Sequence, residues 1–259
     1  MALVCYALED PAVRKRYSLE KVREFPPGLD SLYTKAINDI RRSKDADLCR
    51  NILAVTTIVR RPLSLQELIS LAEELDEFSE DLESLEEIIS ICSSFLSLRS
   101  GKVYFVHQSA KDFLLGDISD QKGSEASQQT FNWVFPSGKE TEHYQLLSKS
   151  VNAMSGTLKR DMYGLRSPGF PIDEVSVRTP DPLAAIRYSC VYWVDHLFDG
   201  QRSDNTKHPD IFQDGGIIDD FLRKHYLHWL EALSLCRNMS QGIFSMTKLE
   251  SFLQVSTSR

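Results

Sequence analysis

Several chemical signatures are missing from this chain of 259 residues. Its five cysteines are separated by more than 40 residues each and form no CxxC pair, so neither a zinc site nor a disulfide framework is expected. The uncharged apolar run Ile88–Leu98 has eleven residues, too few to cross a bilayer. Basic residues near the N-terminus follow the first apolar stretch, which is the reverse of a secretory signal. We therefore expect a cytoplasmic protein with reduced thiols and no membrane partner.

Catalytic motifs are missing as well. The string nearest to a phosphate-binding loop, Ser137-Gly138-Lys139, lacks the upstream glycine, and Glu140 stands where a magnesium-binding Ser or Thr is needed. The patterns GxGxxG, GxSxG and HExxH are absent. The sequence therefore predicts a protein that is not an enzyme and carries no cofactor.

Positive charge is in the minority. The chain has 37 acidic and 30 basic residues, a net charge of −7. Residues Pro62–Leu98 contain ten carboxylates and no Lys or Arg. Because phosphate contacts supply most of the affinity for nucleic acids, we expect no nucleic-acid partner.

Apolar residues recur at helical spacing through most of the chain. One run spans Leu29–Ile40, and a second spans Leu48–Val59 and ends before Pro62. Two capping boxes, Ser64 with Glu67 and Ser84 with Glu87, predict the starts of the next two helices.

The pattern then changes to short strands. Residues Phe95–Leu98 and Val103–Val106 flank Arg99-Ser100-Gly101-Lys102, which predicts a β-hairpin. Ser109 with Asp112 predicts the cap of a closing helix. Helices, one hairpin and a closing helix within this span indicate a winged-helix-like unit.

The second half reads as helices alone. Residues 117–142 are rich in Ser, Gln, Gly and charge and predict a mobile linker, with the alternative that its apolar residues Phe131, Trp133, Val134 and Phe135 dock on another part of the chain. Helices are expected from His143 to Gly156, from Asp181 as N-cap with Pro182 first, from Asp219 or Asp220, and from Ser245 or Thr247. The fold class predicted is mainly α, a winged-helix-like unit with one small β-hairpin followed by an α-helical array. The predicted divisions are 1–24, 25–116, 117–142 and 143–259.

Four histidines occupy positions of possible chemical interest. His225 and His228 are neighbours on a predicted helix, but Cys236 is roughly 16 Å further along it and cannot complete a metal site. Asp195 and His196 are adjacent, so their side chains point apart on a helix. His107 ends the second hairpin strand, on a rigid corner, where its ring either contacts a partner or bonds to nearby backbone. No metal site is predicted.

Three strings carry a family resemblance: FPPGLDSLYTKAINDI, RRPLSLQELISLAEEL and YFVHQSAKDFLL. They resemble fungal NACHT proteins of the signal-transducing ATPase class, in the winged-helix region similar to that of GPI inositol-deacylase-like proteins. YSCVYWVDHL and FLRKHYLHWLEALSL look like the helical segment that follows it. By this resemblance, residues 1–24 look like the end of a helix from an upstream nucleotide-binding module. Met1 would then be an internal residue of a longer protein, and the alternative is a true start at Met1.

The resemblance implies a non-catalytic regulatory arm that acts with a NACHT nucleotide-binding module in non-self recognition and programmed cell death. In related switches a Met-His-Asp motif at the hairpin corner senses bound ADP. His107 takes that place, with Val106 for Met and Gln108 for Asp, and would be a nucleotide sensor once a NACHT module is supplied. The alternatives are a stand-alone adaptor or decoy for other NACHT proteins and a winged-helix DNA-binding regulator, which the acidic helices disfavour.

Overall fold

The computed structural model describes residues 29–72, 74–116, 125–166, 169–201 and 214–257. The helix end expected at 1–24 lies outside these residues. Within the described chain, residues 29–62 and 80–136 form one compact unit, and residues 63–79 and 137–257 form a second.

The first unit is helical apart from one hairpin. Its elements are α3 (Leu29–Arg41), α4 (Ala46–Ile58), α6 (Leu82–Ile91), β2 (Leu96–Arg99), β3 (Lys102–Phe105), α7 (Gln108–Leu115) and α8 (Glu125–Val134). The predicted fold class, mainly α with a winged-helix-like unit, is confirmed.

Three aromatic rings form the centre of the first unit. Tyr33 of α3 lies 5.3 Å from Phe95 and 5.3 Å from Phe113 of α7, measured between ring centroids. All three side chains are buried. Tilted rings at this separation stabilise a core beyond the area they bury. The three rings therefore pack α3 and α7 against Phe95, the residue just before β2.

The hairpin follows the prediction with a shift of one residue. Strands β2 and β3 are antiparallel, with Leu96 opposite Phe105 and Arg99 opposite Lys102. Ser100 and Gly101 have φ of 50° and 70°, the two left-handed residues of the tight turn that suits the twist of a hairpin.

One of the two predicted capping boxes is present. Ser64 and Glu67 cap α5 (Leu65–Leu71) reciprocally, as expected. The box at Ser84 is wrong, because Asp81 is the N-cap of α6 and its carboxylate accepts the Ser84 N–H. Asp81 also accepts a hydrogen bond from the Ser84 hydroxyl, so that hydroxyl serves the cap residue.

Helix α8 lies within the segment that was expected to be a linker. Ser127 donates from its hydroxyl to the Phe113 carbonyl, and Val134 and Phe135 are buried. The Arg41 guanidinium lies 5.1 Å from the centre of the Trp133 ring. Apolar residues of this polar stretch therefore dock on the first unit, which is the alternative that the sequence left open.

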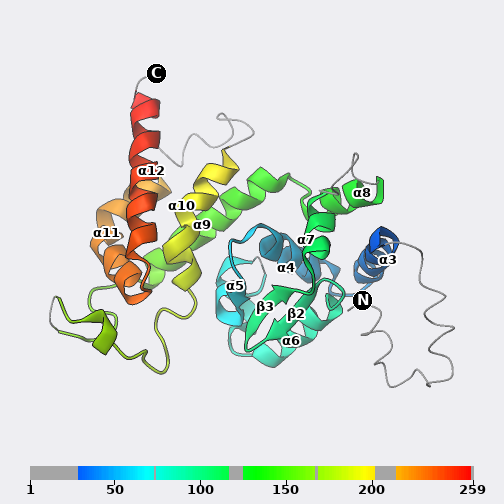
Figure 1. Ribbon diagram of the computed structural model, residues 1–259, viewed down its shortest axis with the longest axis horizontal. Coiled ribbons are helices and arrows are strands. Elements are labelled where there is room, and N and C mark those ends of the chain that lie inside the picture. Colours follow the sequence, from blue (N-terminus) through cyan, green and yellow to red (C-terminus); the bar gives the residue numbers. More distant parts are fainter. Residues whose placement is uncertain (1–28, 73, 117–124, 167–168, 202–213, 258–259) are drawn as a thin grey trace. The chain divides into compact units, whose positions relative to one another are not determined.

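The second unit begins with a two-residue strand, β1 (Leu63–Ser64), and continues with α5. Its other elements are the 3₁₀ turns η2 (Asp76–Ser79) and η3 (Ile172–Glu174), and the helices α9 (Lys139–Thr157), α10 (Arg187–Gly200), α11 (Ile217–Leu235) and α12 (Met239–Thr257). Helices α9 and α10 lie side by side, and α11 and α12 pack beside α10 (Figure 1).

Tryptophans form the centre of this helical stack. Trp193 of α10 and Trp229 of α11 meet edge to face with centroids 5.6 Å apart, and Phe221 lies 5.7 Å from Trp193. The buried Trp229 Nε1–H donates to the Cys190 carbonyl over 2.8 Å, which satisfies the ring's polar atom inside the core.

All four helix starts predicted for the second half of the chain differ from the structure. Helix α9 begins at Lys139 rather than at His143, and α11 begins at Ile217, with Gly216 as its N-cap, rather than at Asp219 or Asp220. Helix α10 begins at Arg187 rather than Pro182 because the Asp181 carboxylate holds the preceding chain in turns, accepting the Leu183 N–H. Helix α12 begins at Met239, well before Ser245. In contrast, the described residues from Gly164 to Pro182 are largely irregular, as the four prolines of this stretch predict.

The hairpin turn generates a prediction about glycine. Replacing Gly101 by Ala forces a Cβ into the left-handed region and should cost about 1 kcal/mol of unfolding free energy. Gly156→Ala, in α9 with open space around the added methyl, is the matched control and should stabilise the chain by roughly 0.5 kcal/mol. Urea titrations followed by circular dichroism measure both; equal effects of the two substitutions would contradict the turn geometry.

Candidate functional site

His107 is the first candidate site, at the corner between β3 and α7. Strand β3 ends at Phe105, α7 begins at Gln108, and His107 between them is the N-cap. Its Nδ1 accepts the backbone N–H of Ser109 over 3.1 Å. The expected Ser109 cap is therefore wrong: the imidazole takes the position of the cap, and the helix begins earlier.

Ser109 connects this exposed imidazole to the core of the first unit. Its hydroxyl lies 2.7 Å from His107 Nδ1 and 2.9 Å from the Tyr33 hydroxyl. The consistent assignment runs from Tyr33 O–H to Ser109 Oγ, and from Ser109 O–H to His107 Nδ1. That assignment puts the proton of the neutral ring on Nε2, so His107 presents an N–H donor at the surface that suits an anionic oxygen.

Gln108, the residue after His107, forms a hydrogen bond within α7. Gln108 donates from its amide to the Asp112 carboxylate over 2.8 Å. The corner therefore presents an exposed imidazole on a helix start that is tied to a buried tyrosine.

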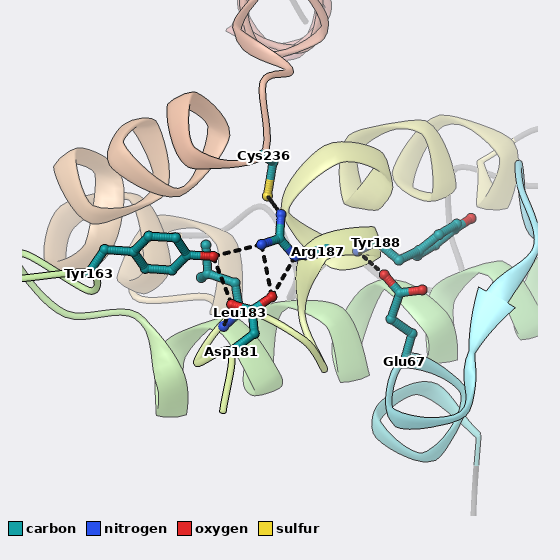
Figure 2. Close-up of polar contacts among 7 residues, drawn as sticks. All are labelled: Glu67, Tyr163, Asp181, Leu183, Arg187, Tyr188 and Cys236. Atoms are coloured by element: carbon teal, nitrogen blue, oxygen red, sulfur yellow. Dashed lines mark hydrogen bonds and ion pairs between the residues drawn. The ribbon is translucent and has the colours of Figure 1, made fainter. Parts of the chain in front are cut away.

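Glu67 is the second feature, and it lies in the second unit (Figure 2). Its side chain is only 2% exposed. One carboxylate oxygen accepts the Ser64 N–H over 2.9 Å, and the other accepts the Tyr188 N–H over 3.0 Å. The first N–H groups of a helix have no partner within that helix. A single buried carboxylate therefore satisfies such groups at the starts of both α5 and α10.

Two further hydrogen bonds anchor α5 to the helical stack. The Ser70 hydroxyl donates to the Ala185 carbonyl over 2.8 Å, just before α10. Lys149 of α9 donates from Nζ to the Ala72 carbonyl over 3.0 Å, just after α5. Glu67 in the first turn of α5, Ser70 in its last turn and the carbonyl that follows the helix are therefore each bonded to α9, to α10 or to the turn just before α10.

An ion-pair cluster fixes the chain that leads into α10. Arg187 donates to Asp181 over 2.9 Å from Nε and lies 2.8 Å from it through Nη2. Arg187 Nη2 also donates to the Tyr163 hydroxyl over 2.7 Å, and that hydroxyl donates to Asp181 over 2.8 Å. Figure 2 shows these three side chains converging below Cys236.

The protonation of the cluster follows from its partners. Burial acts to raise the pKa of Asp181, but hydrogen bonds from the Leu183 N–H, Tyr163 and Arg187 outweigh it and lower that pKa below its usual value. Burial, together with the hydrogen bond to Asp181, raises the pKa of Tyr163 to about 12. The cluster is therefore an ionised pair with a neutral phenol between its charges.

The other histidine positions do not assemble a site. His225 and His228 have rings 5.8 Å apart, and His225 stacks on Phe221. Across the described ranges, no three His, Cys, Asp or Glu side chains are grouped so that they could hold a metal ion.

Asp195 and His196 turn away from each other, as predicted. The Asp195 carboxylate pairs with Lys248 of α12. His196 instead contacts the Tyr188 hydroxyl over 2.7 Å and His143 over 2.8 Å, in the core beside α9. Neither residue is placed to act on the other.

Comparisons with known proteins agree with the fold. Residues 37–128 match the family described as GPI inositol-deacylase, winged helix domain. The chain is 54% identical over 253 residues to the vegetative incompatibility protein HET-E-1 of Podospora anserina, across 98% of this chain. It spans 19% of that relative's length. No solved structure matches the chain significantly. The resemblance to fungal NACHT proteins and their winged-helix region is confirmed.

No helix in the described part of the chain is both long and apolar enough to span a membrane.

The double cap at Glu67 generates a prediction. Glu67→Gln leaves one accepting oxygen and turns an N–H donor toward a backbone N–H, so it should lower the unfolding free energy by about 1–3 kcal/mol. Glu67→Ala should cost more, because both backbone groups lose their acceptor. Glu250→Gln, at an exposed position of α12, should stay within about 0.5 kcal/mol of the parent. Urea denaturation measures all three, and a silent Glu67→Gln would refute the double cap.

The raised pKa of Tyr163 predicts how the stability of the folded chain changes at alkaline pH. Its pKa is raised on folding from 10.0 to about 12, so its contribution to stability is complete below pH 10 and is lost as the pH rises toward 12. The stability difference between the parent and Tyr163→Phe should therefore shrink over that window. Thermal unfolding measured across these pH values, with Tyr226→Phe as control, checks it; a difference that does not depend on pH would contradict the assignment.

Proposed function

We propose that this chain, a relative of fungal NACHT proteins, is a non-catalytic regulatory arm. It would work with a NACHT nucleotide-binding module. The observation that carries the proposal is the 54% identity to a vegetative incompatibility protein along 98% of the chain. The role that this implies is cytoplasmic signalling in non-self recognition, leading to programmed cell death.

The anchoring of α5 supports a mechanical role. This helix lies inside the winged-helix match at 37–128, yet it packs in the second compact unit. Glu67, Ser70 and the Ala72 carbonyl bond to Tyr188, Ala185 and Lys149 in that unit. A displacement of α5 would therefore be passed to α9 and α10 rather than absorbed in a flexible joint.

The charge distribution supports a protein partner over DNA. Ten carboxylates and no basic residues lie in Pro62–Leu98, which includes α5 and α6. A helix presented to a DNA groove needs Lys or Arg for phosphate contacts. A DNA-binding regulator would have to bind duplex with a steep salt dependence, which these helices do not favour.

His107 supports a nucleotide-responsive contact with that partner. Its exposed ring is held through Nδ1 by Ser109 and, through Ser109, by Tyr33, which leaves the Nε2 donor for a partner. We propose that this donor approaches a phosphate oxygen of ADP when a NACHT module is docked on the arm. Hydrogen bonds to a charged oxygen are stronger than neutral ones, so one donor can favour one nucleotide state over another.

Binding to a separately purified NACHT module from a fungal relative tests the proposal. The 259-residue chain should bind the ADP-loaded module roughly tenfold more tightly than the ATP-loaded one, as expected for a coupling of 1–3 kcal/mol. His107→Asn keeps a good N-cap and should abolish this preference without loss of stability. His228→Asn is the matched control and should leave it unchanged. Calorimetry measures the affinities.

Each alternative has its own outcome in that experiment. No binding by the folded chain in either nucleotide state would refute the regulatory arm. Equal binding in both states, unchanged by His107→Asn, would favour the adaptor or decoy. ATP turnover by the chain alone, abolished by a point substitution within it, would contradict a non-catalytic role.

A further inference from the structure

Two cysteines of the second unit meet beside the Arg187 cluster. Cys236 caps the C-terminal end of α11, and Arg187 Nη1 donates to its sulfur over 3.8 Å. Cys190 stands three residues after Arg187 on α10, and residues at this spacing share one helix face. The Cys190 thiol is hydrogen-bonded to Cys236. A guanidinium and a second thiol thus contact the same sulfur (Figure 2 shows the guanidinium).

The two thiols differ in access. Cys236 is partly exposed, whereas Cys190 is fully buried. The carbonyl of Cys190 is held by the Trp229 ring N–H, which fixes its backbone in the core. Of the two residues, Cys236 (the outer thiol) is therefore the one that a small polar oxidant can approach. Cys190 (the inner thiol) is shielded from solvent and can react only with its neighbour.

The donors of Arg187 are divided between its partners. Nε and Nη2 face Asp181 and Tyr163, and Nη1 faces Cys236. Asp181 and Cys236 do not compete for Arg187, because the carboxylate accepts from Nε and Nη2 whereas the sulfur accepts from Nη1. A positive charge beside a thiol favours the thiolate, the form that attacks peroxides.

We propose that Cys236 is a peroxide-reactive thiol and that Cys190 resolves its oxidised form into a reversible disulfide. The Cys236 thiolate attacks one oxygen of hydrogen peroxide, the O–O bond breaks, and sulfenic acid and hydroxide are formed. The Cys190 sulfur then attacks the Cys236 sulfur, the S–O bond breaks, and water leaves with the proton of the Cys190 thiol. The peroxide gains the two electrons that the sulfurs lose.

The electrostatics fit this order of events. The hydrogen bond with Cys236, burial and the negative charge that Cys236 carries as a thiolate raise the pKa of the Cys190 thiol, so Cys190 stays protonated when the outer sulfur attacks as a thiolate. Sulfenic acid carries no charge, and its formation removes that repulsion. The inner thiol therefore becomes a better nucleophile only after the outer one has been oxidised.

The chain contains an internal comparison. Cys49 and Cys92 of the first unit also lie in hydrogen-bond contact, but both are completely buried. Peroxide has no access to either sulfur in the folded chain, so this pair should stay reduced under conditions that oxidise Cys236.

The test treats the folded chain with hydrogen peroxide and maps its thiols by mass spectrometry after alkylation. Cys5→Ser is used as background throughout, so that only the paired cysteines remain. The expected product is a Cys190–Cys236 disulfide that dithiothreitol reverses. Cys190→Ser should instead accumulate a sulfenic acid on Cys236 that dimedone traps, Cys236→Ser should form neither product, and Cys92→Ser should behave as the parent.

Arg187→Gln tests the role of the guanidinium and should slow oxidation of Cys236 several-fold. Because this substitution can also disturb the fold, the rate of iodoacetamide labelling of Cys236 against Cys92 in the background chain is measured as well, and Cys236 should react faster. Equal labelling rates, or peroxide treatment that leaves Cys236 reduced or couples it to a cysteine other than Cys190, would overturn the proposal.

Discussion

The buried carboxylate of Glu67 is the constraint on which the second unit depends. Leaving a charged group inside a protein is costly unless its hydrogen bonds are satisfied, and here backbone N–H groups of Ser64 and Tyr188 satisfy both oxygens. Removing either helix start would leave the charge exposed to apolar surroundings. The same carboxylate therefore fixes α5 in place and sets where α10 begins its packing on α9.

Local chemistry made much of the fold predictable. The helices near Leu29 and Ala46, the Ser64–Glu67 box and the hairpin turn at Ser100–Gly101 depend on residues close in sequence, and all were anticipated. The predicted cap of α7 was wrong for a local reason. Serine is a more common N-cap residue than histidine, so the sequence favoured Ser109, whereas the ring of His107 caps the helix in the structure.

Long-range partners account for what the sequence could not reveal. Glu67 was recognised as half of a capping box, whereas its bond to Tyr188 joins residues far apart in the chain. Asp181 was predicted to be an N-cap, but its carboxylate is hydrogen-bonded to Tyr163 and Arg187, and α10 begins only at Arg187. Similarly, no periodicity pairs Cys190 with Cys236. His107 was singled out from its place at a corner, and its link to Tyr33 through Ser109 emerged only in three dimensions.

Hydrogen exchange at single amides tests the central claim, that one carboxylate couples α5 to the helical stack. In the parent chain the amides of Ser64 and Tyr188 should both be protected. In Glu67→Ala both should lose protection together, and by similar factors, because they share one acceptor. Loss confined to Ser64, with Tyr188 still protected, would mean that α5 and α10 are capped independently, and the coupling on which the proposed regulatory arm depends would be absent.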